Sequence, residues 1–269
     1  MVRPGWAPEG IDLERPSTAR IYDYALGGLH NFAVDREAAR AVFAAMPDLP
    51  LIMQANRAFL RRAVQYLAGA GVRQFLDLGS GIPTVGNVHE VAQQIIPDAR
   101  VMYVDVDPVA VAHSRLVLAD NAYASVIQED LRQPEQLVSH PEVRKLLDFD
   151  RPIGLLLLAV LQFVAPEENP AGIIARYRDA LPAGSYLVIS QPTRDARSEE
   201  GDRVERLIHQ RATERFYYAD RATFESYFTG WELVPPGIVW LPQWRPDSPD
   251  DVDEHPERSI VYVGAGRKA

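Results

Sequence analysis

The stretch "FLDLGSGIPT", residues 75–84, decides the fold class of this chain. An apolar run leads into two glycines separated by one residue, and a helical pattern follows. This order predicts a strand, a tight turn and a helix. Glycines let the backbone of such a turn approach a ligand closely, and the free N–H groups of the next helix add donors. We therefore expect a ligand site directly after this strand.

Apolar runs of strand length alternate with helical patterns from residue 72 to residue 191. Strands that alternate with helices in this way predict an α/β fold with a doubly wound, mostly parallel sheet. Weaker apolar runs near 231–240 and 259–263 should complete the sheet with an antiparallel C-terminal strand. The later runs of the alternating region are "VMYVD" (101–105), "ASVIQED" (124–130), "IGLLLLAV" (153–160) and "SYLVIS" (185–190).

Helical patterns also precede the first strand, at about 17–25, 35–46 and 51–71. Residues 1–16 are rich in proline, glycine and charge, which is typical of a loose arm. We therefore divide the chain into an N-terminal arm and helical lid, residues 1–70, and a Rossmann-like domain, residues 71–269. The charged helical region near 194–228 is expected to be an insert of this second domain.

The stretch "RIYDYALGGLHNFAVD", residues 20–35, has an unusual mixture of aromatic, glycine and polar residues. Helices before the first strand of such a fold can cover the strand ends, so we expect a lid over the glycine turn, with Gly27 and Gly28 as its joint. A capped helix followed by a turn is the alternative. The residues expected to provide walls and hydrogen bonds are Tyr22, Tyr24, Phe32, Asn31 and Asp35.

Asp77, two residues before Gly79, distinguishes between two nucleotide ligands. The dinucleotide fingerprint G-x-G-x-x-G is broken, because Thr84 stands at its third glycine position. A carboxylate beside a pyrophosphate would be repelled by about 1–4 kcal/mol at a few Å. The same carboxylate attracts the sulfonium and ammonium groups of S-adenosylmethionine. The D-x-G-x-G turn therefore favours S-adenosylmethionine over NAD.

Acidic residues also end the next two strands. Asp105 lies 26 residues after Gly79 (105 − 79), where a carboxylate can accept hydrogen bonds from both ribose hydroxyls. Asp107 is its neighbour, but the proline that follows indicates that the chain has already turned. Asp130, after the third strand, is placed to accept from an adenine amino group, with Leu131 against the ring. Acids at three successive strand ends together predict one nucleoside site.

These motifs resemble those of class I S-adenosylmethionine-dependent methyltransferases over roughly residues 72–191. Over its whole length, the chain is similar to a family of S-adenosyl methyltransferases that have no assigned substrate. The motifs that carry this closer resemblance are "RPSTARIYDYALGGLHNFAVDREAA" (15–39), "NRAFLRRAVQYL" (56–67), "RQFLDLGSGIPTVGNVHEVAQ" (73–93), "VDVDPVAVAHSR" (104–115), "LLLLAVLQFV" (155–164) and "WRPD" (244–247).

The resemblance implies an enzyme that transfers a methyl group from S-adenosylmethionine to a small-molecule acceptor. In such enzymes the segment around Gln162 faces the methyl group. Family members carry His there, and the amide of this chain cannot replace His as a base near neutral pH. The residues expected to contact the cofactor are Asp77, Gly79, Ser80, Gly81, Asp105, Val106, Asp130, Leu131, Ala159 and Gln162, together with Asn31 and with Arg57 or Asn56 as the donor to its carboxylate.

No residue stands out as a catalytic base. The sulfonium is already a good leaving group, so alignment and a dry pocket matter most. A base is needed only if the acceptor must lose a proton early, and the candidates are Tyr22, Asp23, His30 and Asp35. A noncatalytic protein that binds or senses S-adenosylmethionine, a dehydrogenase and an aminopropyl-type transferase remain as alternatives.

Composition limits the partners of the chain. A net charge of −9 argues against nonspecific nucleic-acid binding. With no cysteine there is no disulfide, thiolate nucleophile or Cys-ligated zinc, and no spacing such as H-E-x-x-H suggests another metal. The longest apolar run is too short to span a bilayer, and the N-terminal residues lack a signal peptide. We expect a cytoplasmic protein without nucleic-acid or membrane partners, for which a homodimer is allowed.

Overall fold

The structure is a computed structural model, and it describes residues 12–84, 86–211 and 214–269. Most of the loose arm predicted for residues 1–16 therefore lies outside the described residues, as do two residues of the predicted insert, 212 and 213. Within the described ranges, eight strands form one sheet. They are β1 (Gln74–Leu78), β2 (Arg100–Asp105), β3 (Ala124–Gln128), β4 (Gly154–Leu158), β5 (Tyr186–Pro192), β6 (Glu232–Leu233), β7 (Val239–Trp240) and β8 (Val261–Arg267).

The order of the strands confirms the predicted doubly wound fold. They lie in the order β3-β2-β1-β4-β5-β8-β6, and β7 also pairs with β8. The first five strands run parallel to one another, whereas β8 runs antiparallel to β5, β6 and β7. The chain order reverses between β1 and β4. Ligands of such sheets bind at this reversal, beyond the carboxyl ends of the strands.

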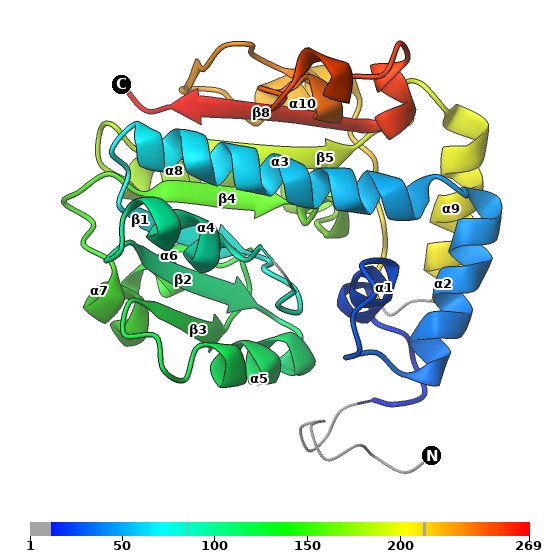
Figure 1. Ribbon diagram of the computed structural model, residues 1–269, viewed down its shortest axis with the longest axis horizontal. Coiled ribbons are helices and arrows are strands. Elements are labelled where there is room, and N and C mark those ends of the chain that lie inside the picture. The colour runs from blue at the N-terminus through cyan, green and yellow to red at the C-terminus, as the bar shows by residue number, and fades with distance from the viewer. Residues whose placement is uncertain (1–11, 85, 212–213) are drawn as a thin grey trace.

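Helices cover both faces of the sheet (Figure 1). Successive side chains of a strand point to opposite faces, so Phe75 packs in the core with α3 and α4, and Leu76 packs in the core with α6, α7 and α8. The helices of the first face are α3 (Leu49–Gly69), α4 (Val88–Ile95) and α5 (Pro108–Val117), and those of the second face are α6 (Pro134–Ser139), α7 (Pro141–Leu146), α8 (Pro170–Ala180) and α10 (Arg221–Ser226).

Helix α3 shows how the sequence pattern produces this packing. Its buried residues Phe59, Leu60, Ala63, Val64 and Leu67 recur at spacings of one, three and four, so they lie on one face of the helix. That face belongs to the core cluster that includes residues of β1 and β4. Helix α3 therefore packs with the sheet, although the division proposed from sequence places it in the N-terminal region.

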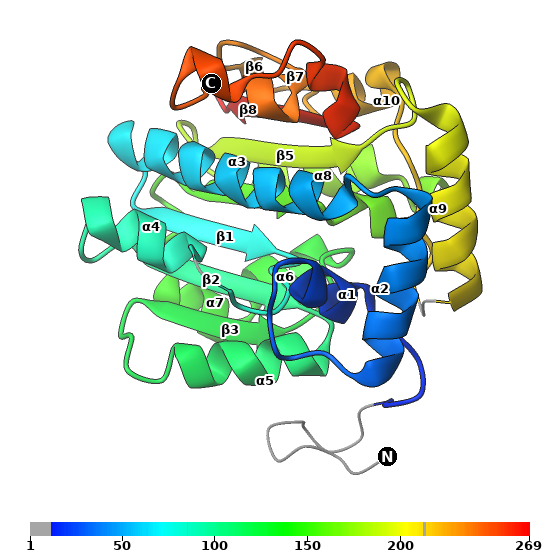
Figure 2. The ribbon, with the colours of Figure 1, turned by 45° about the vertical axis from the view of Figure 1, so that its right-hand side comes forward.

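The remaining long helices stand across the end to which the parallel strands point (Figures 1 and 2). They are α1 (Thr18–Ala25), α2 (Ala33–Ala45) and α9 (Ser198–Arg211). Helix α9, from the predicted insert, lies beside α2 in both views. Two of the helices predicted before the first strand, α1 and α2, thus lie at the strand ends. No helix among the described residues is long and apolar enough to cross a membrane.

Short 3₁₀ helices connect several of these elements. The one that matters for the site is η1, because it follows β4 directly at the end of the sheet where the chain order reverses. The described 3₁₀ helices are η1 (Leu161–Phe163), η2 (Pro166–Glu168), η3 (Leu241–Gln243), η4 (Pro249–Asp251) and η5 (Pro256–Ser259).

Candidate active site

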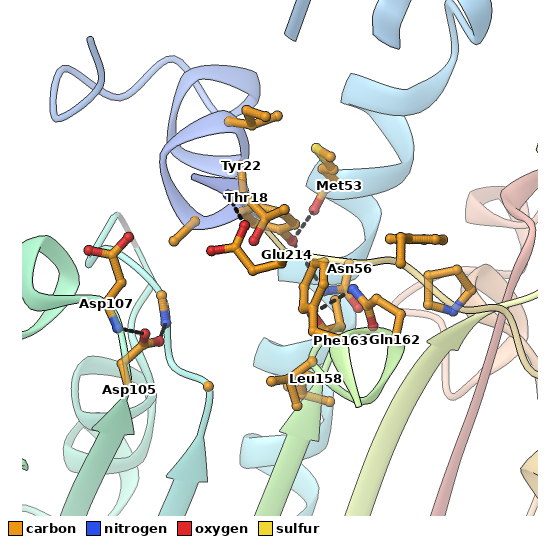
Figure 3. Close-up of a pocket in the computed structure, with 18 of the residues that line it drawn as sticks. Thr18, Tyr22, Met53, Asn56, Asp105, Asp107, Leu158, Gln162, Phe163 and Glu214 are labelled. Carbon is orange, nitrogen blue, oxygen red and sulfur yellow. Dashed lines mark hydrogen bonds between the residues drawn. The ribbon is translucent and has the colours of Figure 1, made fainter. Parts of the chain in front are cut away.

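A cavity of about 580 Å³ lies at the carboxyl ends of β1, β2 and β4. Small-molecule sites have volumes of roughly 300–1,000 Å³, so a cavity of this size can hold a nucleoside cofactor. Its walls combine the loops after these strands with residues of α1 and α3 (Figure 3). Val204 and Ile208 of α9 also line it. The cavity therefore lies where the sequence predicted a ligand, between the glycine turn and the lid.

The glycine turn after β1 is packed tightly against the neighbouring strand ends. Gly79 has a φ of +70°, and a Cβ atom at this position would lie 2.2 Å from Cγ2 of Val160. Only glycine fits there without moving the loop after β4. The N–H of Gly81 donates to Oδ2 of Asp105 over 2.7 Å. The glycine turn after β1 is thus in contact with the ends of both neighbouring strands, β2 and β4.

Asp105 accepts two backbone hydrogen bonds at the end of β2. Besides Gly81, the N–H of Asp107 donates to its Oδ1 over 2.8 Å (Figure 3). Burial raises the pKa of Asp105 to about 6, while these backbone donors lower it. Each carboxylate oxygen retains a second lone pair, so the ribose hydroxyls predicted for this residue still have acceptors.

Asp107 does not have the same role as Asp105, because the chain turns into α5 at the proline that follows it. It caps α5 by accepting from the N–H of Val109 over 2.7 Å. Its Oδ2 also accepts from the Ser17 hydroxyl over 2.6 Å. Asp107 therefore joins Ser17, the residue before α1, to the loop after β2 in the wall of the cavity.

Asp77 and Arg57 bring opposite charges to the polar end of the cavity. Burial raises the pKa of Asp77 to about 7, although the charge of Arg57 lowers it; the charge of Asp105 raises it further. Nη2 of Arg57 donates to the carbonyl oxygen of Gly86 over 3.0 Å. Nε of Arg57 is buried and has no hydrogen-bond partner in the described part of the chain. An ammonium near Asp77 and a carboxylate near Arg57 would satisfy both groups, which fits an amino-acid tail.

The predicted adenine residue Asp130 is paired with a cation that the sequence analysis missed. Nε of Arg132 donates to both oxygens of Asp130 at 2.9 Å, and its Nη1 donates to Glu168 over 2.9 Å. Burial raises the pKa of Asp130, whereas the hydrogen bonds from Arg132 lower it. The pKa of Asp130 is, as a net result, below its ordinary value. An adenine amino group would therefore share this carboxylate with Arg132. The predicted neighbours Leu131 and Val106 also line the cavity.

The loop after β4 brings Gln162 to the cavity wall. Ala159 has a φ of +50°, which is uncommon for a residue other than glycine and is often found at functional sites. Nε2 of Gln162 donates to the Ala159 carbonyl oxygen over 2.7 Å. The backbone carbonyl oxygen of Gln162 accepts a hydrogen bond from the N–H of Tyr217 over 2.8 Å. This backbone contact ties the segment after α9 to the strand end at which methyl transfer is expected.

Tyr22 is the candidate base that faces the cavity. Its hydroxyl donates to the carbonyl oxygen of Met53 over 3.1 Å and lies 3.1 Å from Nδ2 of Asn56 (Figure 3). Burial raises the pKa of Tyr22 above its ordinary value of 10. Since the phenol stays protonated near neutral pH, its geometry suits positioning better than proton abstraction.

The other candidates from the lid do not line the cavity. The carboxylate of Asp35 accepts from Arg20 Nε over 2.9 Å and from the N–H of Phe32 over 2.7 Å. Nδ2 of Asn31 donates to Asp23 over 2.8 Å. These contacts hold α1 and α2 together, so all three residues have a structural role. The geometry does not support Asp23 or Asp35 as a base, nor Asn31 as a cofactor contact.

The turn between α1 and α2 is closely packed as well. A Cβ atom on Gly28 would lie 2.0 Å from Oδ1 of Asp23, so a side chain there would displace Asp23. The ring of His30 lies 3.6 Å from that of His113 on α5, measured between centroids. Tyr24 stacks against Phe43 of α2, away from the cavity wall. The predicted lid therefore contributes α1 residues to the cavity, whereas its glycine turn packs against Asp23 and His113.

An aromatic wall after α9 was not predicted from the sequence. Phe216 packs edge-on against Phe163 at 5.9 Å and against Tyr218 at 4.9 Å, measured between ring centroids. These three aromatic residues line the cavity, as does Glu214, which accepts from the N–H of Thr18 over 3.3 Å. The cluster "ERFYY", residues 214–218, was the available signal. Among the described residues, no group of three or more His, Cys, Asp or Glu is arranged to hold a metal.

Comparison with known proteins identifies the family. A family model described as S-adenosyl methyltransferase matches residues 4–269. No curated protein matches the chain. A crystal structure of a candidate methyltransferase from Thermobifida fusca YX is 40% identical, covers 98% of this chain and 99% of its own, and superposes with a TM-score of 0.92. For a DUF574 family protein from Streptomyces avermitilis MA-4680, identity is 39%, coverage is 96% and 99%, and the TM-score is 0.91.

The fold extends to more distant structures. An O-methyltransferase family protein from Burkholderia thailandensis is 12% identical, covers 88% of this chain and 60% of its own, and has a TM-score of 0.54. At this identity the likeness concerns the fold alone. Together with the glycine turn, the strand-end acids and the match over nearly the whole chain, the comparisons show that the chain belongs to the S-adenosyl methyltransferase family, whose cofactor is S-adenosylmethionine.

Proposed function

We propose that this chain transfers the methyl group of S-adenosylmethionine to a small-molecule acceptor bound in the same cavity. The observation that carries the proposal is the chemical division of the cavity. Its end at β1 and β2 is polar, with Asp77, Arg57 and Asp105. A second part of its wall, with Met46 after α2 and Ile208 of α9, is apolar and belongs to one hydrophobic cluster. The first part suits the cofactor, and the second suits an apolar acceptor.

The residues of the chain then have to bind, orient and dehydrate the two reactants. The sulfonium of S-adenosylmethionine supplies an activated methyl group when it is bound. Gln162, after β4, lies where the acceptor atom is expected to approach. The lid and the aromatic residues after α9 exclude water, which keeps the reactants aligned. Since Gln162 cannot accept a proton and Tyr22 stays protonated, we propose an acceptor that attacks without prior proton transfer to either residue.

The composition supports a small acceptor inside the cell. The net charge of −9 disfavours a nucleic-acid acceptor. A chain without cysteine fits the reducing cytoplasm. We also propose a division of the chain into a lid of residues 1–70 and a domain of residues 71–269, although α3, in the first part, packs into the core of the sheet.

Labelled-methyl transfer tests this proposal. The protein would be incubated with methyl-labelled S-adenosylmethionine and a small-molecule cell extract, and both S-adenosylhomocysteine and labelled products would be measured. We expect label in at least one extract molecule and an equal amount of S-adenosylhomocysteine. Binding of the cofactor without any transfer would instead identify a binding or sensing protein.

A further inference from the structure

Two amide side chains of the cavity wall have their orientation fixed by backbone carbonyl groups. The Tyr22 hydroxyl donates its hydrogen to the Met53 carbonyl oxygen, so its oxygen must accept from Nδ2 of Asn56. Nε2 of Gln162 donates to the Ala159 carbonyl oxygen. Because a carbonyl oxygen can only accept, both amides must direct their NH2 groups to these partners. Their own carbonyl oxygens are left for another donor.

Those two carbonyl oxygens, Asn56 Oδ1 and Gln162 Oε1, are buried and have no hydrogen-bond partner among the residues that the structure describes. Asn56 is 6% exposed and Gln162 is 4% exposed, and both line the cavity. Figure 3 shows both amide groups in the same part of the cavity, between Tyr22 and Leu158. Buried acceptors are normally satisfied, so this pair calls for a ligand group that carries two donors.

The wall around these amides suits a flat, apolar body. Phe163 follows Gln162 directly, and its ring packs edge-on against Phe216. Met46 and Ile208 line the same cavity from α2 and α9. Aromatic rings pack well against such walls in edge-on or offset arrangements.

The charges of the cavity disfavour an acidic acceptor. In the described lining, seven carboxylates stand against three guanidinium groups, and an anion would be repelled by this excess. The carboxylates belong to Asp77, Asp105, Asp107, Glu129, Asp130, Glu168 and Glu214, and the guanidinium groups belong to Arg57, Arg132 and Arg215.

We propose that the methyl acceptor is an uncharged aromatic amine, whose NH2 group donates to Asn56 Oδ1 and Gln162 Oε1 and attacks the methyl group. The inference rests on the proposed function and names the acceptor class for it. An NH2 group has two N–H donors, one for each oxygen, whereas a hydroxyl has one and would leave an acceptor unsatisfied. An aromatic amine is weakly basic, so its lone pair is free near neutral pH.

The step balances without a base in the cavity. The nitrogen lone pair forms the new N–C bond while the C–S bond breaks and its electron pair stays on sulfur. The nitrogen becomes a cationic ammonium group and afterwards releases one proton to water. As positive charge develops on nitrogen, both N–H···O bonds strengthen. Asn56 and Gln162 therefore stabilise the transition state more than the bound amine.

Matched probes test this inference by binding alone. Protein saturated with S-adenosylhomocysteine would be titrated calorimetrically with 4-butylaniline, 4-butylphenol, 4-butylbenzoate and N,N-dimethyl-4-butylaniline. Because each lost hydrogen bond weakens binding by roughly 3- to 10-fold, we expect the aniline to bind best, the phenol and the dimethyl compound to be weaker, and the benzoate to be weakest. Equal binding of the aniline and its dimethyl derivative, or no binding of any probe, would overturn the inference.

A pair of glutamine variants assigns the effect to the cavity. Gln162→Met should reduce the preference for the aniline over the phenol to about 2-fold or less. Gln191→Met is the matched control, because Gln191 also has a buried carbonyl oxygen without a partner in the described residues but does not line the cavity. If Gln162→Met weakens S-adenosylhomocysteine instead, the amide binds the cofactor and the inference is wrong. Failure of wild-type protein to bind S-adenosylhomocysteine would contradict the proposed function itself.

Discussion

The N–H of Gly81 donates to Oδ2 of Asp105 over 2.7 Å, so the carboxylate at the end of β2 holds the glycine turn that follows β1. The second oxygen of this carboxylate accepts from the N–H of Asp107 over 2.8 Å. Asp105 therefore shapes the cofactor turn and also presents its remaining lone pairs to the cavity. A substitution of Asp105 should therefore weaken cofactor binding in two ways. It removes a contact with the cofactor, and it removes the hydrogen bond that holds the glycine turn.

Asp105→Ala should weaken S-adenosylmethionine binding by about 1–3 kcal/mol, because it removes a charge-assisted acceptor. Calorimetric titration of the folded variant measures the change. Asp120→Ala is the control, because Asp120 is exposed and does not line the cavity. Equal affinity of wild type and Asp105→Ala, with both proteins folded, would refute the ribose assignment.

Gly79→Ala should destabilise the fold and abolish cofactor binding. The new methyl group would lie 2.2 Å from Val160 Cγ2 in a left-handed backbone conformation, and overpacking of this kind costs about 1–3 kcal/mol. Urea unfolding measures the loss. The double variant Gly79→Ala/Val160→Ala should be less unstable than the sum of the two single variants, because the clash is relieved. Simple additivity would show that the contact with Val160 is not what requires glycine.

Arg57→Met should weaken binding of S-adenosylmethionine but leave decarboxylated S-adenosylmethionine almost unaffected. Nε of Arg57 is buried without a partner in the described residues, and a ligand carboxylate would supply the missing acceptor. The expected loss is about 1.5–3 kcal/mol, as for hydrogen bonds to charged groups. Parallel titrations with the two ligands measure it. A similar loss for both ligands would show that Arg57 supports the cavity without contacting the carboxylate.

Cofactor affinity should rise with pH between about pH 5 and pH 8. Burial raises the pKa of Asp77 to about 7 and that of Asp105 to about 6, so both carboxyls are partly protonated in the free protein over this range. A cationic ligand favours their ionised forms, and binding therefore releases protons. Calorimetry near pH 6.5 in buffers of different ionisation enthalpy measures this release. Asp77→Asn should reduce it, and unchanged release in that variant would contradict the assignment.

The same shifts fix the sign of the pH dependence of stability. Both folded-state pKa values lie above the ordinary value of 3.8, so the folded protein binds more protons than the unfolded chain between about pH 4 and pH 7. The free energy of unfolding of the cofactor-free protein should therefore fall as pH rises through this window. Other ionisable groups contribute as well, so the comparison of wild type with Asp77→Asn isolates the contribution of Asp77.

The strand-end residues could be predicted from sequence because their positions follow from local patterns. An apolar strand that ends in D-x-G-x-G must place Asp77 and Gly79 at the carboxyl end of a parallel sheet, and Asp105 ends the adjacent strand for the same reason. The pairing of β1 with β2 and β4 brings these residues to one cavity. The mostly parallel, doubly wound sheet was likewise expected from the alternation of strands and helices, and the antiparallel C-terminal strand was expected from the apolar runs of the tail, whereas the order of the strands was not predicted.

The lid residues could not be assigned from sequence, because their partners are far away in the chain or on neighbouring helices. A polar residue such as Asp35 can face a ligand or hold two helices together, and only its contacts with Arg20 and Phe32 show the second role. Similarly, the packing of Phe216 on Phe163 depends on tertiary structure. The pairing of Arg132 with Asp130, in contrast, is a local contact between residues two positions apart in the chain. Local patterns predicted the position of the lid but not which of its faces is turned inward.

Direct titration of the wild-type protein with S-adenosylmethionine, S-adenosylhomocysteine and NAD tests the central claim most directly. The cavity geometry predicts one site per chain for each S-adenosyl ligand and weaker binding of NAD than of either, because the acid at Asp77 repels a pyrophosphate. Saturable binding of NAD together with no binding of either S-adenosyl ligand would contradict the account.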